Sequence, residues 1–282
     1  MPDIQSVLID SAGTLNNISD SASLDVEVLL CHALKKNRTY LRTWPDKQLT
    51  GKQLQHFEHL LQQRQQGQPI AYIIGQREFW SRDFHVDHNV LIPRPDTETL
   101  IELCLQLIHH QPNASIIDLG TGSGIIAITL AAEYPQLNIT AVDNSAAALK
   151  VAQHNAKLNH TPNIRFLKSD WFAQVSKESF DFIVSNPPYI ASSDPHLNEG
   201  DVRFEPSCAL VAAQQGLQDI IQITAQSQHY LNKGGYLIFE HGYDQKQQVH
   251  EILHQHHYQN IHCQHDLANQ PRISYGQWIN SL

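Results

Sequence analysis

Cysteine is scarce in this chain, and its spacing excludes the usual covalent and zinc frameworks. The 282 residues include four cysteines, all far apart and none in a Cys-x-x-Cys pair: Cys31, Cys104, Cys208 and Cys263. A disulfide scaffold or a zinc knuckle requires cysteines that are paired at short spacing. We therefore expect neither kind of site.

Positive charge is also in short supply. The chain has 19 lysine and arginine residues against 28 aspartate and glutamate residues, so its formal net charge is −9. Proteins that bind the phosphate backbone of nucleic acids usually carry a basic surface. Residues 1–90 are almost neutral and offer no basic domain for reading bases. We expect no direct binding to nucleic acid.

Long apolar runs are missing as well. No stretch approaches the roughly 20 apolar residues with which a helix crosses a bilayer, and the first residues lack the pattern of a secretory signal. The sequence therefore predicts a cytoplasmic protein with no membrane partner, and we expect a monomer.

Histidine, in contrast, is abundant, with 18 copies. Several lie near the C-terminus, where His250 and His254 have the spacing that places two side chains on one helix face. A metal site is one interpretation of this cluster. The same region and residues 62–66 are rich in glutamine, which favours compositional drift on solvated surfaces. We expect no metal.

Residues 1–68 are predicted to form a small helical bundle with no chemistry of its own. Thr50 is placed to cap one helix, and Gly67 is placed to end it. The apolar residues recur at helical spacing in three stripes: Ile4, Val7, Leu8 and Ala12; Leu24, Val28, Leu29 and Ala33; Leu54, Phe57, Leu60 and Leu61.

Residues 69–92 have a strand-like pattern and are predicted to form a β-hairpin linker, with strand segments at 71–74, 78–80, 84–86 and 90–92. The segment 93–98 follows and leads into a helix, for which Asp96 or Thr97 is the predicted cap. The two prolines around Arg94 fit either an ordinary linker or a rigid wall of a pocket.

Residues 93–282 alternate between strand and helix patterns, which predicts an α/β fold with a mostly parallel sheet and a C-terminal antiparallel strand pair. Such sheets bind ligands at the carboxyl ends of their strands. The predicted strands are 115–119, 138–142, 164–167, 180–184, 235–240, 260–267 and 272–279, and the predicted helices include 125–130, 146–158, 218–230 and 244–256.

The first of these strands runs directly into a glycine turn and then into a helix. No Cβ atom blocks a ligand in such a turn, and N–H groups at the helix start point into the site. The spacing is Gly-x-Gly-x-Gly, which differs from the patterns of dinucleotide and phosphate loops and disfavours a pyrophosphate ligand. The turn consists of Gly120, Thr121, Gly122, Ser123 and Gly124.

Acidic residues follow the next two strands. Asp143 ends the second strand, where a carboxylate can accept hydrogen bonds from a ribose diol. Asp170 and Trp171 follow the third strand, where an acid and a ring can hold an adenine by its amino group and its face. The sequence therefore predicts a nucleoside site at this edge of the sheet.

The fourth strand ends in Asn186, Pro187, Pro188 and Tyr189. The prolines stiffen the turn, Asn186 offers an amide, and Tyr189 offers a flat ring with a polar tip. Hydrogen bonds from an NH2 group to the Asn186 side chain and the Pro187 carbonyl would aim the nitrogen lone pair at a neighbouring electrophile. The alternative interpretation is a rigid turn without chemistry.

Taken together, these motifs resemble those of class I S-adenosylmethionine-dependent methyltransferases that act on amide or amino nitrogen. With Phe204-Glu205-Pro206, the segment 92–98 and the helical N-terminus, the chain resembles the release factor glutamine methyltransferases, the HemK or PrmC family, over nearly its whole length. The resemblance implies a Rossmann-like sheet and a helical substrate-docking domain. At residues 269–272 the sequence follows the family's tail pattern only loosely, so we assign no role to Arg272.

The resemblance also implies roles for single residues. Gly120 to Gly124 would pass beneath the methionine part of S-adenosylmethionine, Asp143 would hold the ribose, and Asp170 with Trp171 would border the adenine. Residues 186–189 would receive the glutamine of the Gly-Gly-Gln motif in class 1 peptide release factors, with Asn186 also beside the cofactor. The expected product is N5-methylglutamine.

Three alternatives stay open at this point. A sister enzyme that methylates a glutamine of ribosomal protein L3 shares the Asn186 to Tyr189 motif. A nucleic-acid adenine methyltransferase shares it too, although the charge distribution argues against this class. The third alternative is a cofactor-binding module without catalysis, against which the complete set of motifs argues.

Overall fold

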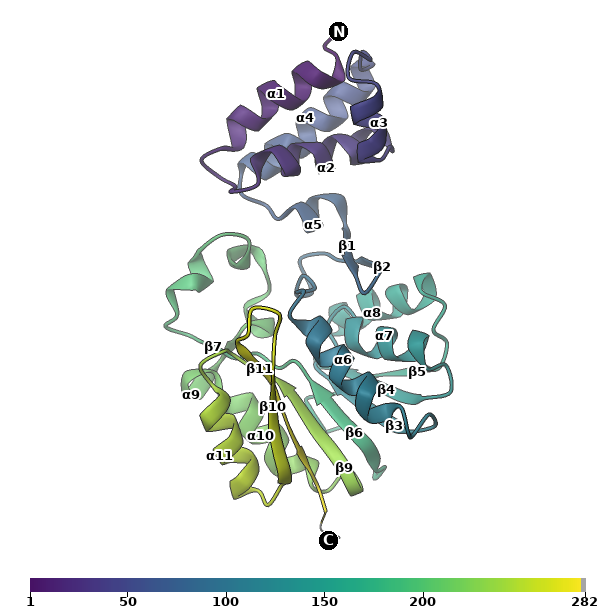
Figure 1. The fold of residues 1–282 in the computed structure, drawn as a ribbon, viewed down its shortest axis with the longest axis vertical. Helices are drawn as coiled ribbons and strands as arrows, with labels where there is room; N and C mark the ends of the chain where they lie inside the picture. Colours follow the sequence, from purple (N-terminus) through teal and green to yellow (C-terminus); the bar gives the residue numbers. More distant parts are fainter. Residues whose placement is uncertain (280–282) are drawn as a thin grey trace. The chain divides into compact units, whose positions relative to one another are not determined.

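The computed structural model describes residues 1–279, and these residues form two compact units (Figure 1). The helical unit consists of Met1–Gln76 together with Asn198–Phe204. The sheet unit consists of Arg77–Leu197 and of the residues from Glu205 onward. The predicted boundaries at 68 and 92 remain a prediction.

The helical unit contains α1 (Ile4–Leu15), α2 (Ala22–Leu34), α3 (Arg38–Thr43), α4 (Gly51–Gln65) and α5 (Ile70–Ile74). Thr50 caps α4 as predicted, in a reciprocal capping box with Gln53. The predicted stripe of α2 is wrong at Leu24, whose side chain is 43% exposed. The apolar residues of α2 that are buried in the core of the unit are Ala22, Val26, Leu29 and Leu30.

The prediction of a strand at 71–74 is also wrong, because this segment forms α5. Helix α5 begins after Pro69 and ends at Gly75, which adopts the left-handed conformation. Ile70, Ile73 and Ile74 have helical spacing and pack against the helical core. Burial on that face outweighs the strand preference of β-branched side chains.

A small hairpin follows, formed by β1 (Gln76–Phe79) and β2 (Arg82–His85). Trp80 and Ser81 connect the two strands, and both have positive φ angles, as a type I′ turn requires. Trp80 is therefore a turn residue and not the strand residue that we predicted. No strand forms at residues 90–92, where we also predicted one.

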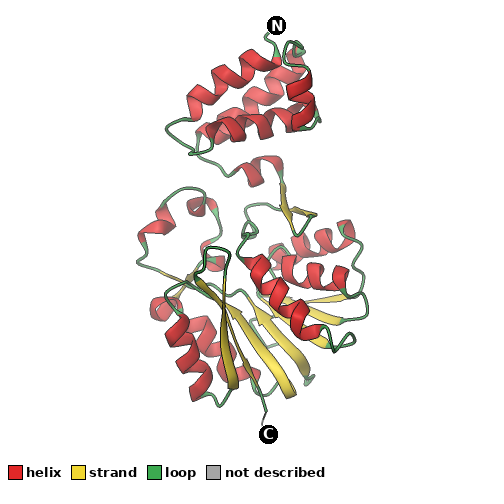
Figure 2. Cartoon of the chain, viewed as in Figure 1, coloured by secondary structure: helices red, strands yellow, loops and turns green. Residues whose placement is uncertain are grey.

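The sheet unit is built on a seven-stranded sheet, whose strands are yellow in Figure 2 and labelled in Figure 1. The strand order is β10-β11-β9-β6-β3-β4-β5. Five strands are parallel, and the last two run antiparallel to their neighbours, which confirms the predicted fold class. The strands are β3 (Ser115–Leu119), β4 (Asn138–Asp143), β5 (Ile164–Lys168), β6 (Phe180–Ser185), β9 (Leu231–Glu240), β10 (Gln259–His265) and β11 (Pro271–Gln277).

Helices cover both faces of this sheet, because neighbouring residues of each strand point to opposite sides. Ile116 and Phe182 belong to one core, and Ile117 and Ile183 belong to the other. The first core includes residues of α6 (Thr97–Ile108), α7 (Ile125–Glu133) and α8 (Ala146–Leu158), and the second includes residues of α10 (Gln218–Ser227) and α11 (Lys246–Gln255).

The chain reverses its direction across the sheet at β3. Strand β4 lies on one side of β3, and β6 lies on the other. A crevice is expected at the carboxyl ends of the strands at such a point. After β6 the chain forms the short elements β7 (Ile190–Ala191), β8 (Val211–Ala212) and α9 (Ala213–Gly216), with 3-10 turns at Pro195–Asn198, Val202–Phe204 and Ser207–Ala209.

Candidate active site

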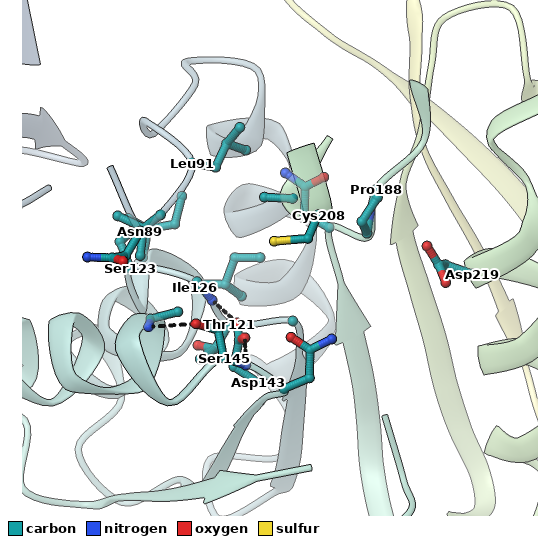
Figure 3. Close-up of a pocket in the computed structure, with 18 of the residues that line it drawn as sticks. Asn89, Leu91, Thr121, Ser123, Ile126, Asp143, Ser145, Pro188, Cys208 and Asp219 are labelled. Carbon is teal, nitrogen blue, oxygen red and sulfur yellow. Dashed lines mark hydrogen bonds between the residues drawn. The ribbon is translucent and has the colours of Figure 1, made fainter. Parts of the chain in front are cut away.

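A cavity of about 450 Å³ opens at this edge of the sheet (Figure 3). This volume lies in the range of small-molecule sites. Nine of the twelve predicted site residues line it: Gly120, Thr121, Gly122, Ser123, Asp143, Asp170, Trp171, Asn186 and Pro188. The other three, Gly124, Pro187 and Tyr189, are not among its lining residues.

The glycine turn forms the floor of the cavity. Gly120 and Gly122 have φ angles of +74° and +56°, a region that side chains rarely adopt. The N–H groups of Gly120 and Thr121 both donate to the Val142 carbonyl at 2.9 Å, which ties the turn to β4. A Cβ atom on Gly120 would lie 3.4 Å from the Trp171 ring, so the backbone passes directly beneath that ring.

Asp118 supports the turn from behind. Its carboxylate accepts a hydrogen bond of 2.6 Å from the Thr121 hydroxyl and a longer one of 3.3 Å from the Ala127 N–H. Complete burial raises the pKa of Asp118 to about 7. Sequence reasoning gave Asp118 no role, although its position at the end of β3, just before the turn, is a usable signal.

Asp143 is held at the cavity by backbone groups. One carboxylate oxygen accepts from the Gly122 N–H at 2.9 Å, and the other accepts from the Ser145 N–H at 2.8 Å (Figure 3). Burial raises the pKa of Asp143, and these N–H donors oppose that shift. The fixed carboxylate keeps further lone pairs for a ligand that carries hydroxyl groups.

Trp171 and Asp219 form the next part of the wall. Trp171 has a φ angle of +43°, and its indole lies close enough to the Asp219 carboxylate to oppose the rise in the pKa of that group. Burial and the nearby charge of Asp170 raise the pKa of Asp219. Asp170 itself is exposed. We missed Asp219, for which the only sequence signal is an acid in the first turn of α10.

Asn186 follows β6 and faces the cavity. Its Nδ2 atom lies 3.4 Å from the Thr97 hydroxyl at the start of α6. Thr97, predicted only as a helix cap, lines the same cavity. Asp96 occupies the cap position, but its side chain does not cap α6 and instead lies 3.3 Å from Arg272.

Pro187 is buried and Tyr189 is half-buried, and neither residue lines the cavity. The Tyr189 hydroxyl lies 3.4 Å from Glu240 Oε1, and its carbonyl accepts from Gln245 at 2.9 Å. Burial, followed by the charge of Glu240, raises the pKa of Tyr189. The role of these two residues toward a substrate stays a prediction.

Arg94 and Pro93 line the cavity, as the interpretation of the proline-flanked segment as a pocket wall suggested. The Arg94 guanidinium lies 2.7 Å from the Glu205 carboxylate, whose side chain is fully buried. This pair ties the wall at residues 93–94 to the segment that carries Cys208 and Ala209, which also line the cavity.

Two features are absent from the part of the chain that the structure describes. Within residues 1–279, no three histidine, cysteine, aspartate or glutamate side chains are grouped in a way that would hold a metal ion. The metal interpretation of the C-terminal histidines therefore receives no support from their placement. No helix in the same range is both long and apolar enough to cross a membrane.

Two known families match consecutive parts of the chain. The PrmC N-terminal domain matches residues 7–75, and the methyltransferase small domain matches residues 95–201. The release factor glutamine methyltransferase of Aliivibrio fischeri is 49% identical over 263 residues, which cover 93% of this chain and 92% of that protein. The enzyme of the same name from Escherichia coli is 44% identical over 260 residues, which cover 92% and 94%.

Solved structures share the fold at low identity. A methyltransferase from Pyrococcus furiosus has a TM-score of 0.53 and 14% identity, covering 72% of this chain and 91% of its own. The catalytic domain of hMettl16 has a TM-score of 0.56 and 19% identity, covering 70% and 76%. These likenesses concern the fold alone.

Proposed function

The chain belongs to the release factor glutamine methyltransferase family, and from this premise we propose that its pocket holds S-adenosylmethionine beside a glutamine side chain of a class 1 peptide release factor. The reaction is transfer of a methyl group to the amide nitrogen of the glutamine in a Gly-Gly-Gln motif. The observation that carries the proposal is that Asn186 lines the same cavity as the glycine turn and Asp143.

The cavity fits the cofactor. The glycine turn leaves room for the methionine part, because a Cβ atom on Gly120 would fill space against Trp171. Asp143 offers acceptors for the ribose hydroxyls, and Trp171 with Asp170 and Asp219 offers a ring and acceptors for an adenine. When bound, S-adenosylmethionine supplies an electrophilic methyl group on a sulfonium ion.

The substrate nitrogen needs positioning more than it needs a base. An amide nitrogen is a weak nucleophile because its lone pair is delocalised into the carbonyl. Asn186 points its Nδ2 atom toward Thr97, which leaves its Oδ1 atom to accept from the substrate NH2. The Pro187 carbonyl is the proposed second acceptor. Two such bonds aim the nitrogen at the methyl group, and orientation of this kind lowers a barrier by several kcal/mol.

The test is transfer of labelled methyl from S-adenosylmethionine to a purified class 1 release factor. The matched control is the same factor with the Gly-Gly-Gln glutamine replaced by alanine. We expect label on the unmodified factor alone. Absence of label on both factors, with cofactor binding intact by calorimetry, contradicts the proposal.

Two further substrates belong in the same assay. Label on ribosomal protein L3 would identify the sister activity, and label on an adenine-containing DNA would identify a nucleic-acid enzyme. The almost neutral residues 1–90 and the net charge of −9 oppose the DNA alternative. We expect no label on DNA at any salt concentration.

We also propose that the protein acts in the cytoplasm as a monomer. The cytoplasm is where its proposed substrate works, and one chain contains all the residues of the proposed site. Light scattering coupled to size exclusion measures the mass directly, and a value near 32.0 kDa is expected. A mass of twice that value contradicts the monomer.

A further inference from the structure

Thr97 lies between two polar side chains at the back of the cavity. It is the first residue of α6 and is completely buried. The Asn186 Nδ2 atom donates a hydrogen bond of 3.4 Å to its hydroxyl oxygen. The same hydroxyl lies near the Glu240 carboxyl group, where it opposes the rise in pKa that burial causes. Thr97 therefore contacts Asn186 and lies close to Glu240.

The contact with Thr97 fixes the direction in which the Asn186 amide points. An amide side chain donates from its nitrogen and accepts at its oxygen. Asn186 presents its NH2 group to the Thr97 hydroxyl. The Oδ1 atom of Asn186 is thereby turned toward the cavity, where the proposed substrate NH2 requires an acceptor.

Glu240 also holds the far end of the same turn. It ends β9, directly beside β6, since Phe239 pairs with Ser185. Its Oε1 atom lies 3.4 Å from the Tyr189 hydroxyl. This carboxyl group, 1% exposed, thus contacts the last residue of the turn.

The charges around Glu240 bear on its ionisation. Burial raises the pKa of Glu240 to about 7, the positive charge of Arg272 opposes this shift, and Asp96 adds to it. Arg272 is itself held by the Asp266 carboxylate at 3.1 Å.

We propose that Thr97 is a positioning residue that fixes the rotamer and amide orientation of Asn186, so that its Oδ1 atom accepts from the substrate amide. The inference rests on the proposed function, because it assigns a use to the Asn186 acceptor. Thr97 does not contact the reacting atoms and acts through Asn186.

Thr97→Val tests the inference, because valine has nearly the same shape and lacks the hydroxyl, and Thr97→Ser is the matched control that retains it. We expect valine to lower kcat about tenfold and serine to stay within about twofold of the wild type, by the usual worth of one hydrogen bond. The KM for S-adenosylmethionine should change in neither. Equal kcat values for wild type and Thr97→Val overturn the inference while leaving the proposed function intact.

A double-mutant cycle shows whether Thr97 acts through Asn186 or by a general effect on the fold. In an Asn186→Ala background the Thr97 hydroxyl has nothing to orient, so Thr97→Val should change kcat less than about twofold. A further tenfold loss in that background contradicts the inference.

A third readout does not depend on methyl transfer. The side-chain NH2 signal of Asn186 in a nitrogen–proton spectrum is assigned by its disappearance in Asn186→Ala. We expect this signal to shift in Thr97→Val and to return toward its original position in Thr97→Ser. If no release factor is methylated, the proposed function fails, yet this spectrum still shows whether Asn186 is hydrogen bonded to Thr97. An unchanged Asn186 signal in Thr97→Val overturns the inference.

Discussion

Arg64 and Asp25 form a buried ion pair in the helical unit, with the Arg64 Nε atom 2.8 Å from the Asp25 carboxylate. A second nitrogen of Arg64 lies 2.9 Å from Asp201, in the segment 198–204 that belongs to this unit. The same nitrogen donates to the Gln68 carbonyl at 2.9 Å. Arg64 thus joins α2, the end of α4 and a segment that is distant in sequence.

Loss of the Arg64 charge should destabilise the helical unit. Arg64→Met keeps much of the side-chain volume but leaves Asp25 buried without its partner. A buried charge that loses its partner costs about 3–5 kcal/mol. We expect the free energy of unfolding to fall by about 3 kcal/mol, the lower end of this range, because Asp201, the second partner of Arg64, is half-exposed. Native-state hydrogen exchange of the α2 and α4 amides in the full chain measures it.

The matched control is Arg38→Met. Arg38 also pairs with an acid, Glu27, but its side chain is half-exposed. Exposed ion pairs contribute about 0–1 kcal/mol. Equal losses in the two variants would show that burial of the Arg64 pair has no special weight.

Asn186→Ala should slow methyl transfer by about tenfold to a hundredfold, equivalent to roughly 1–3 kcal/mol of transition-state stabilisation. The reason is the loss of the acceptor that aims the substrate nitrogen. Affinity for S-adenosylmethionine, measured by calorimetry, should change little. Asn113→Ala makes the same chemical change in an exposed turn and should leave kcat unaltered. Unchanged turnover in Asn186→Ala would remove the assigned role.

Gly124→Ala should weaken both the fold and the cofactor site. Gly124 has a φ angle of +87°, and a Cβ atom there would lie 2.6 Å from Ile128 and 3.2 Å from Ala152. Backbone strain and overpacking together predict a loss of about 2–3 kcal/mol in unfolding free energy. Urea titration followed by circular dichroism measures this loss.

Gly13→Ala is the comparison for this glycine. Gly13 lies in α1, and a Cβ atom there would meet nothing within 4 Å. Alanine is favoured over glycine in a helix by about 1 kcal/mol, so this variant should be as stable as the wild type or more stable. A similar loss at both positions would contradict the strain argument.

Asp118 should make the sheet unit less stable as the pH rises. The pKa of Asp118 is raised to about 7 by burial, while an unfolded aspartate has a pKa near 3.9. Between these values the folded protein holds a proton that the unfolded chain has released, so raising the pH favours unfolding. Above about pH 7 the effect is complete.

The test compares Asp118→Asn with the wild type, because asparagine still accepts from Thr121 and does not titrate. Between pH 4 and pH 7 the free energy of unfolding of the variant should rise relative to that of the wild type by more than about 1.4 kcal/mol, the equivalent of one pKa unit. His241→Asn serves as a control of opposite sign. Burial lowers the pKa of His241 to about 4, so the wild-type residue favours folding as the pH rises toward 6.5. If the unfolding free energies of Asp118→Asn and of the wild type change in parallel with pH, the raised pKa of Asp118 is contradicted.

Much of the sheet unit could be predicted because its signals are local. Each strand that carries a motif is a short apolar run, and α8 spans the residues that its pattern predicts. The carboxyl ends of parallel strands share one edge, so Gly120, Asp143 and Asn186 could be placed together from order alone. The predicted glycine turn, acids and amide line one cavity for this reason.

The contacts of Thr97 and Glu240 with the predicted site could not be predicted, because they link distant parts of the sequence. Thr97 reaches Asn186 across 89 positions, and Tyr189 reaches Glu240 across 51. Neither pair has a pattern in the sequence around it. The strand prediction at 71–74 failed for a related reason, since Ile70 and Ile73 pack against helices that precede them in the chain.

The membership of segment 198–204 in the helical unit has a practical consequence for dissecting the protein. The chain passes from the sheet unit into the helical unit and back between Leu197 and Glu205, so no single cut separates the two. A fragment that starts at Arg77 would keep Asp201 but lose Arg64, and a fragment that ends at Gln76 would keep Arg64 without Asp201. Truncation at residue 76 therefore yields two incomplete pieces, and complementation of the pieces in one tube is the more informative experiment.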